Sequence, residues 1–184
     1  MLLLLAAGKS ERYGVSDKLA EDFLGKPLAF HVVTAMENLP FKARIVVVDG
    51  ARLDFASRGY RVVTNERPQD GVSGSVRLAV ATAREANPTS VIIALADMPR
   101  VTAAQIHRLF DASKGAESVV ASSDGVSPKP PALFGSAHFD TLENLTGDEG
   151  ARPLIRAGRH VVTTPAELID IDTIEELDEL RKLF

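Results

Sequence analysis

The sequence predicts an α/β fold, namely one three-layer α/β/α domain over residues 1–184, built on a mostly parallel, Rossmann-like sheet. The first observation is that short apolar runs alternate with helical patterns along the chain, which favours parallel strands joined by helices. The second is that residues 45–48 (IVVV) and 91–96 (VIIALA) show no polar alternation, as is typical of strands buried on both faces. With 184 residues, 45% of them hydrophobic, the chain can bury a core of ordinary size.

The strands are expected where β-rich apolar residues form short runs. These runs are Leu2–Ala6, Arg44–Val48, Arg61–Thr64, Val91–Ala96, Ser118–Ser122 and His160–Thr163. The stretch Asp124–Pro131 is rich in glycine, serine and proline. It is therefore predicted to be a turn-rich loop inside the domain.

The helices are expected between these strands. The first opens with a proline, which a first turn tolerates, and the third has Thr102 as its cap and Ile106, Leu109 and Phe110 on one stripe. The predicted helices are Pro27–Asn38, Gly74–Ala86, Thr102–Ser113, Arg152–Ala157 and Thr173–Leu183.

Composition excludes several classes of function. The net charge is −4 with acids and bases interspersed, so we expect no nucleic-acid partner. There is no cysteine, which excludes disulfides, thiolate metal sites and cysteine nucleophiles. The apolar start, residues 2–7, is too short to span a bilayer and lacks the basic lead-in of a signal peptide. We therefore expect a soluble, cytoplasmic protein with no membrane partner.

The first strand leads into Gly8-Lys9-Ser10, a triplet that also ends many phosphate loops. A Walker loop needs a glycine five positions before Gly8, where Leu3 stands. A dinucleotide fingerprint needs glycines at positions that Ser10 and Tyr13 occupy. Both hypotheses fail, so the segment must hold a phosphate in another way or not at all.

What remains is a strand that ends in small residues, followed by a polar loop. Small residues let a ligand approach the backbone closely, and the first strand of an α/β sheet delivers its loop to the carboxyl edge, where ligands bind. Lys9, Arg12 and Lys18 could neutralise a triphosphate there. On charge alone, a solvated loop with ordinary surface charges is the favoured explanation, since such loops are common.

Two acidic segments are candidates for holding a divalent cation. Asp97 directly follows the apolar strand 91–96, and a carboxylate at that edge can hold Mg²⁺ against a triphosphate. Asp170 and Asp172 alternate on an extended segment, so they could share a face. The alternatives are that Asp97 merely starts a turn and that Asp172 caps the last helix, with Glu175 three residues on.

Two glycine-containing loops are candidates for binding anions. Gly71 and Gly74 precede a helix whose N-terminus offers free N–H donors, with Asn65 nearby. The alternative there is a turn with Ser73 as the helix cap. Residues 147–152 (GDEGAR) also place glycines before a helix, and Arg152 could bind a phosphate with two parallel hydrogen bonds. The alternative there is that Asp148 caps that helix.

Residues of other catalytic classes do not assemble in the sequence. The four histidines are scattered and form no close-spaced metal pair. Ser10 and Ser75 have no evident base partner, so a serine hydrolase is disfavoured.

Taken together, the motifs resemble those of a known enzyme family. Residues 5–14 (LAAGKSERYG) followed by Lys18, 95–99 (LADMP), 131–134 (PALF), 147–152 (GDEGAR) and 170–173 (DIDT) resemble the signatures of the molybdopterin nucleotidyltransferases. The resemblance runs from Leu2 to about residue 177 and is strongest to the molybdenum cofactor cytidylyltransferases. Ala7 and the GDEGAR element resemble that branch, whereas the guanylyltransferases usually have a second glycine at position 7 and generally lack the element.

The sequence departs from the family pattern at three places. Tyr13 stands where the family usually has methionine, one or two extra residues precede Lys18, and Ile174 replaces a proline. None of these changes removes a charge or a ligand.

The resemblance implies a nucleotidyltransferase fold and a Mg²⁺-dependent reaction. CMP would pass from CTP to the phosphate of molybdopterin or the molybdenum cofactor, releasing pyrophosphate, and a molybdoenzyme could receive the product. The implied catalytic residues are Arg12, Lys18 and Asp97, and the implied metal ligands are Asp97 and Asp172. The implied acceptor-binding residue is Arg152. The implied nucleotide-binding residues are Leu5, Ala6, Ala7, Gly8, Lys9, Asn65, Ser73, Gly74 and Ser75.

Three other functions stay open at this point. The first keeps the fold and transfers GMP to the molybdenum cofactor, or a nucleotide to a sugar or alditol phosphate. The second is a non-catalytic nucleotide sensor that delivers the cofactor, which retention of a complete metal set disfavours. The third, a nicotinamide-dependent reductase, is disfavoured by the missing glycine fingerprint. The choices between Asp170 and Asp172 as second metal ligand, and between Lys9 and Lys18 as phosphate contact, also stay open.

Overall fold

A computed structural model describes residues 1–7, 17–50 and 53–184 of the chain. In these residues a central sheet has the strand order β5-β4-β1-β6-β8-β7-β9. Strand β8 runs antiparallel to both of its neighbours, and the other pairs are parallel. The strands are β1 (Leu2–Ala6), β4 (Arg44–Val48), β5 (Arg61–Thr64), β6 (Ser90–Leu95), β7 (Val119–Ser123), β8 (Pro128–Gly135) and β9 (Arg159–Val162).

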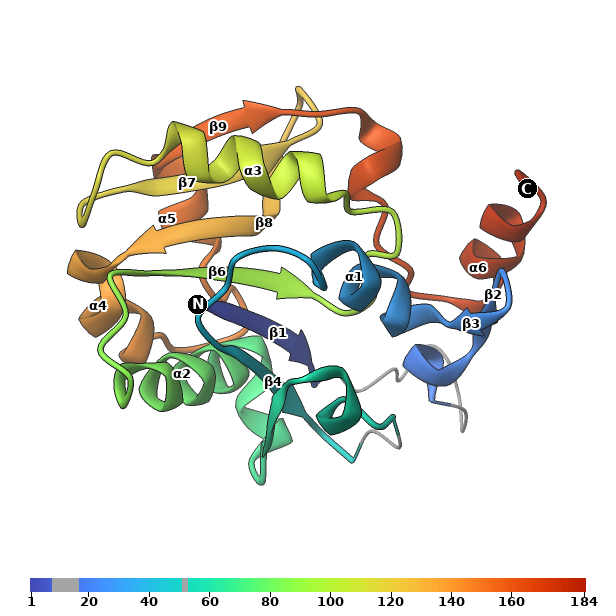
Figure 1. The fold of residues 1–184 in the computed structure, drawn as a ribbon, viewed down its shortest axis with the longest axis horizontal. Coiled ribbons are helices and arrows are strands. Elements are labelled where there is room, and N and C mark those ends of the chain that lie inside the picture. Colours follow the sequence, from blue (N-terminus) through green and yellow to red (C-terminus); the bar gives the residue numbers. More distant parts are fainter. Residues whose placement is uncertain (8–16, 51–52) are drawn as a thin grey trace.

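Helices cover both faces of this sheet (Figure 1). On one face lie α1 (Leu28–Met36) and α3 (Ala103–Ala112), and on the other lie α2 (Gly71–Arg84), α4 (Phe139–Glu143) and α5 (Arg152–Ala157). The remaining helix is α6 (Ile174–Arg181), and short 3₁₀ helices occur at Lys18–Ala20, Ala56–Arg58, Pro68–Asp70, Ser136–His138 and Pro165–Leu168.

Strand β1 shows why the chain folds in three layers. Its four leucines are buried, with Leu2 and Leu4 in the core on the α1 side and Leu3 and Leu5 in the core on the α2 side. Because successive side chains of a strand point to opposite faces, a continuous apolar run needs a cover on both. The predicted α/β class with its mostly parallel sheet is confirmed.

The predicted loop Asp124–Pro131 is wrong in its second half. Strand β8 already begins at Pro128 and reaches Gly135. Three prolines argue against a central strand in the sequence, since proline donates no hydrogen bond to a ladder. The structure accommodates them because β6 pairs with β8 only at 132–135, so the prolines lie where β8 has a strand partner on one side only.

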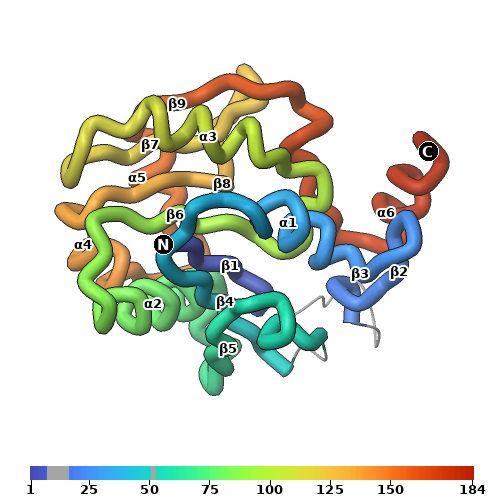
Figure 2. Tube along the Cα trace, viewed as in Figure 1, coloured from blue at the N-terminus to red at the C-terminus, as the bar shows by residue number. Residues whose placement is uncertain are grey.

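A small unit outside the three layers of the fold brings together residues from near the two ends of the sequence. The hairpin of β2 (Asp22–Phe23) and β3 (Lys26–Pro27) packs against α6 around a separate apolar cluster of Phe23, Leu28, Ile171, Leu177 and Leu180. Figure 2 shows this unit at one end of the molecule, beyond the tip of β1. It therefore brings the segment after Asp17 and the segment before α6 to the carboxyl edge of the sheet.

No helix in the described part of the chain is long and apolar enough to cross a membrane.

Candidate functional site

The best-defined polar cluster lies at the carboxyl edge of the sheet, where Lys18 is held between two carboxylates. Its ammonium donates a hydrogen bond to Asp97 Oδ2 at 2.9 Å and lies 3.6 Å from Asp172 Oδ1. Lys18 opens a 3₁₀ helix capped by the side chain of Asp17, and its own side chain is only 9% exposed. Three segments far apart in the sequence thus meet at one point, as expected for a ligand site at this edge.

Backbone contacts fix the two acidic segments to each other. Asp97 follows β6, and its carbonyl accepts a hydrogen bond of 3.0 Å from the amide of Ile171. Ile171 is buried in the apolar cluster under α6, so Asp170 and Asp172 extend on the other side of the segment. Asp172 meets Lys18, whereas Asp170 lines a neighbouring cavity.

The structure corrects the three capping alternatives. The cap of α6 is Thr173, in a reciprocal capping box with Glu176, rather than Asp172 with Glu175. Helix α2 begins at Gly71 with Asp70 at its cap position, and Ser73 lies inside the helix. Ala151 rather than Asp148 occupies the cap position of α5. Thus neither Asp172 nor Asp148 serves as a helix cap.

The electrostatics of Asp97 suit a bound cation. Burial raises the pKa of the Asp97 carboxyl above its usual range, and Lys18 opposes that rise. Asp97 Oδ1 is buried and has no hydrogen-bond partner among the described residues, which is costly for a carboxylate oxygen. A divalent cation would satisfy this oxygen and favour the charged form.

The described residues fit Mg²⁺ in the way that nucleotide enzymes usually hold it. They contain no cluster of three or more acidic, histidine or cysteine side chains that could hold a metal. Mg²⁺ commonly uses one or two carboxylates plus substrate phosphates and water. Asp97 and Asp172 can therefore supply the protein's share of the ligands, and a triphosphate the rest.

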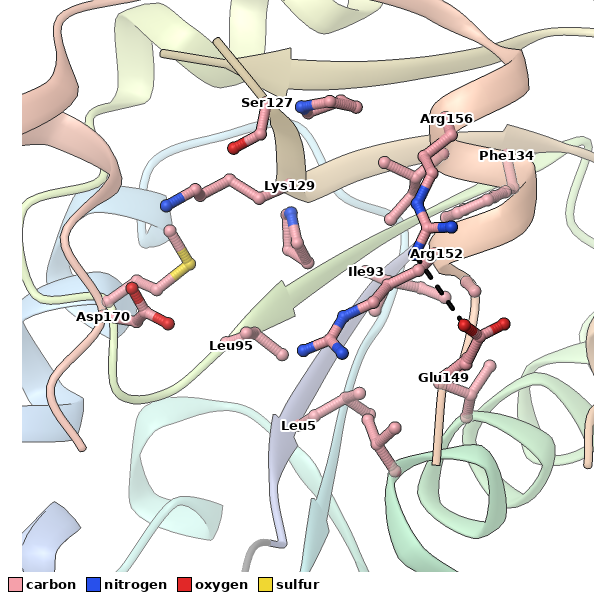
Figure 3. Close-up of a pocket in the computed structure, with 18 of the residues that line it drawn as sticks. Leu5, Ile93, Leu95, Ser127, Lys129, Phe134, Glu149, Arg152, Arg156 and Asp170 are labelled. Atoms are coloured by element: carbon pink, nitrogen blue, oxygen red, sulfur yellow. Dashed lines mark ion pairs between the residues drawn. The ribbon is translucent and has the colours of Figure 1, made fainter. Parts of the chain in front are cut away.

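A cavity of about 610 Å³ opens beside this cluster. Its floor is apolar and includes Leu5 and Leu95, and cations stand on its walls. Figure 3 shows the guanidinium of Arg152 directed into the cavity toward Leu5 and Leu95, with Lys129 extending on the Asp170 side. The cavity can thus receive a ligand that combines an apolar or planar body with negative charge.

Sequence reasoning missed Lys129 and Arg156, which line the same cavity as Arg152. Arg156 pairs with Glu149 at 3.9 Å, and Lys129 lies 3.8 Å from Asp124. Lys129 lies in the proline-rich segment that the sequence predicts to be a loop, so no role was assigned to it. Arg156 stands one helical turn after Arg152, a spacing that places two residues on one face and could have drawn attention to it.

The proposed nucleotide-binding residues are placed as follows. Leu5 lines the cavity and Ala6 is buried at the end of β1. Asn65 and Ser75 are buried, and Asn65 Nδ2 donates to Ser75 Oγ at 3.2 Å. Ser73 is buried and donates to the carbonyl of Thr146 at 3.3 Å. These hydrogen bonds tie the start of α2 to Asn65, which follows β5, and to the loop at Thr146.

Three expected residues lie outside the described part of the chain, namely Gly8, Lys9 and Arg12. Ala7 and Gly74, which complete the expected nucleotide set, lie respectively just beyond β1 and in the first turns of α2.

A mostly parallel α/β sheet has two carboxylates at its carboxyl edge, beside a cation-lined cavity. This arrangement suits an enzyme that handles phosphate esters. Residues 2–162 match the family described as the MobA-like NTP transferase domain. Because this match covers most of the chain, the protein belongs to that family of nucleotidyltransferases.

Individual relatives agree with this assignment. Purine catabolism protein PucB of Bacillus subtilis (strain 168) is 30% identical over 197 residues, covering 98% of this chain and 95% of PucB. A probable molybdenum cofactor guanylyltransferase of Pyrococcus horikoshii is 36% identical over 73 residues, covering 39% of this chain and 38% of that protein.

Solved structures agree on the fold. The crystal structure of Rv0371c from Mycobacterium tuberculosis H37Rv superposes with a TM-score of 0.80 at 24% identity, covering 98% of this chain and 96% of that one. A complex of Rv0371c with manganese gives a TM-score of 0.77 at 21% identity, covering 100% of this chain and 98% of that one.

Proposed function

We propose that the protein transfers CMP from CTP to the terminal phosphate of molybdopterin or the molybdenum cofactor, with Mg²⁺, and releases pyrophosphate. The observation that carries this proposal is the Lys18–Asp97–Asp172 cluster, which adjoins the cavity holding Arg152. A reaction between two anionic substrates needs two adjoining binding regions, each of which offsets negative charge. The name of the Pyrococcus relative supports a molybdenum cofactor acceptor.

The reaction asks little of the protein in proton transfer. A phosphate monoester has a second pKa of about 6, so the acceptor is largely a dianion at neutral pH. One of its oxygens attacks the α-phosphorus of CTP, the bond from that phosphorus to the β-phosphate oxygen breaks, and pyrophosphate leaves. No general base is required, which agrees with a cluster made of carboxylates and a cation.

The protein's task is therefore to align two anions and to neutralise charge as it develops. Asp97 and Asp172 would hold Mg²⁺, which when bound polarises the phosphoryl oxygens and offsets their charge. Lys18, with Arg12, would neutralise the triphosphate and the leaving pyrophosphate. The backbone of residues 6–9 and the start of α2 would hold the nucleotide.

On the other side of the reacting phosphorus, Arg152 would bind the acceptor. Its guanidinium can form two parallel hydrogen bonds to a phosphate. We add Lys129 and Arg156 as acceptor-side cations because they line the same cavity. The acceptor's ring system would lie on the apolar floor, where Leu5 and Leu95 supply contact area.

GMP transfer to the same acceptor is the second candidate, favoured by the match to the Pyrococcus guanylyltransferase. It would use the same fold and the same metal site. Ala7 and the GDEGAR element motivate our preference for CTP. In either case we place the enzyme in the cytoplasm and its product with a recipient molybdoenzyme.

Pyrophosphate release tests the proposal. The purified protein is incubated with Mg²⁺ and molybdopterin or its molybdenum form, and CTP, GTP, ATP and UTP are compared. Release with CTP alone is expected. Release with GTP would show that guanine rather than cytosine is recognised and would leave the proposed metal site unchanged. Nucleotide binding without any pyrophosphate release would overturn the choice of acceptor.

A further inference from the structure

The start of α2 and the loop that carries Arg152 are joined by one side chain, Arg77. Its Nη1 donates to the carbonyl of Leu145 at 2.6 Å, and its Nη2 donates to Asp70 Oδ2 at 2.7 Å. Asp70 stands at the cap position of α2, and Leu145 begins the loop 145–151 that leads into α5. Arg77 therefore contacts both the start of α2 and the loop 145–151. We call the contact between these two segments the boundary.

Other contacts along this boundary leave little room for the two segments to move independently. Ser73 Oγ donates to the carbonyl of Thr146 at 3.3 Å. A side chain at Gly150 would meet Val72 Cγ1 at 2.9 Å, and one at Gly71 would collide with the carboxylate of Asp148. Gly71 and Gly150 also have positive φ values, +63° and +56° respectively, a backbone conformation that favours glycine.

The same boundary forms part of the cavity wall. Val72 and Val76 of α2 line it on one side, and residues 148–152 line it on the other. If the nucleotide binds to the backbone at the start of α2, a shift of that helix start must move the loop that aims Arg152, because the two are linked through Arg77. The two hydrogen bonds of Arg77 are charge-assisted, and such bonds are roughly twice as strong as neutral ones.

We propose that Arg77 is a positioning residue that couples nucleotide binding to the placement of the acceptor loop. The inference rests on the proposed function for the identity of the two ligands. By linkage, a nucleotide that holds the start of α2 would raise the affinity for the acceptor, and the acceptor would raise the affinity for the nucleotide by the same factor. The coupling makes the enzyme bind its two substrates as an aligned pair.

Kinetics of Arg77→Ala test this role. We expect kcat/KM for the acceptor to fall by about 10- to 100-fold, because displacing a bound reactant by about 1 Å can reduce the rate by up to about 100-fold. The Kd of the nucleotide, measured without the acceptor, should change by less than about threefold. Arg77→Lys keeps the charge but cannot reach both partners, so it should restore little. The matched control is Arg84→Ala, which removes the ion pairs from the same helix to Asp140 and Glu143 of α4, away from the cavity, and should leave acceptor kinetics unchanged.

A double-mutant cycle separates positioning from general weakening. If Arg77 acts through the loop that aims Arg152, then Arg77→Ala should cost little more once Arg152→Ala is present. Full additivity of the two effects on kcat/KM would overturn the proposal. So would an equal loss in the Arg84→Ala control.

Hydrogen exchange gives a readout that needs no acceptor. The probe is whichever of CTP and GTP the wild-type protein binds more tightly, with Mg²⁺. In the wild type, the nucleotide should slow amide exchange at 71–76 and also at 145–152. In Arg77→Ala the protection at 71–76 should persist and that at 145–152 should be clearly weaker, since only the other contacts between the segments remain. Protection at 145–152 as strong in the variant as in the wild type would contradict the coupling through Arg77. If the wild type shows this pattern but gives no turnover with a molybdopterin acceptor, the proposed function fails and the coupling stands.

Discussion

At the scale of single residues, Asp97 is the side chain on which the proposed chemistry depends most. We expect Asp97→Asn to reduce pyrophosphate release by at least about 10²- to 10³-fold, a typical loss when a group that stabilises transition-state charge is removed. The fold should survive, because burial already disfavours the charged form of this carboxyl, and asparagine is neutral and of similar shape. Steady-state rates and a urea unfolding curve measure the two effects.

Asp111→Asn is the control for this substitution, since Asp111 is an exposed residue of α3. It should change neither the rate nor the unfolding midpoint. Wild-type turnover in Asp97→Asn would remove Asp97 from the site.

His31 is a second residue whose environment has a measurable consequence. Its Nε2 lies 2.6 Å from the carbonyl of Phe23, and burial lowers the pKa of its imidazole. The unfolded chain therefore binds a proton at higher pH than the folded chain does. This contribution to stability is complete above the unfolded pKa of about 6.5 and is lost as the pH falls through that value toward the folded pKa.

We expect the urea midpoint of the wild type to fall more steeply between pH 7.5 and 5.5 than that of His31→Gln, which keeps a donor but does not titrate. Parallel pH profiles for the two proteins would show that His31 has the same pKa folded and unfolded.

At the scale of elements, the capping box of α6 controls the position of a site residue. Thr173 Oγ1 accepts a hydrogen bond from the amide of Glu176 at 3.2 Å, and Glu176 Oε2 accepts bonds from the amides of Thr173 and Asp172. Thr173→Ala should lower the free energy of unfolding by about 1 kcal/mol. Because the helix start also fixes Asp172, the rate should fall several-fold as well.

Thr141→Ala on α4 serves as the comparison, since it makes the same chemical change at an exposed helical position. Stability lost in Thr173→Ala with full activity retained would show that Asp172 does not depend on this cap.

The elements also show what the sequence could predict. Strands β1, β4 and β5 and helix α5 have the predicted bounds, because each depends on local patterns of apolar residues and turn residues. The second half of β8 was indicated only by the family resemblance of residues 131–134, and its proline-rich first half could not be predicted. Whether a proline is tolerated in a strand depends on which neighbour pairs beside it. The hairpin β2–β3 was missed for a related reason, as its stability comes from packing against α6 at the other end of the chain.

The candidate site likewise contains residues that the sequence could predict and contacts that depend on long-range packing. Asp97, Lys18 and Arg152 could be selected because they stand in motifs that resemble those of the nucleotidyltransferases. The contacts of Lys18 with the two carboxylates and of Arg77 with Leu145 join segments 68 or more residues apart. The placement of Lys129 in the cavity likewise depends on how β8 lies in the sheet. Such contacts follow from the topology of the whole sheet and leave no local signal.

At the scale of the whole molecule, the site should behave as one unit assembled from metal, nucleotide and the two acidic segments. A ligand at a hundred times its Kd stabilises the folded state by about 2.7 kcal/mol. For a domain of this size such a gain raises the melting temperature by roughly 5–10 °C. We therefore expect CTP with Mg²⁺ to produce a shift of this size, and CTP with EDTA to produce a much smaller one.

Variants decide whether that shift arises at the proposed site. In Asp97→Asn the difference between CTP with Mg²⁺ and CTP with EDTA should largely disappear, because this variant lacks the carboxylate that we propose as the metal ligand. In Arg152→Ala the difference should persist, since we propose that Arg152 binds the acceptor rather than the nucleotide. A shift that is independent of the metal in the wild type would mean that the nucleotide is held by the loops alone, and Asp97 and Asp172 would then need another role.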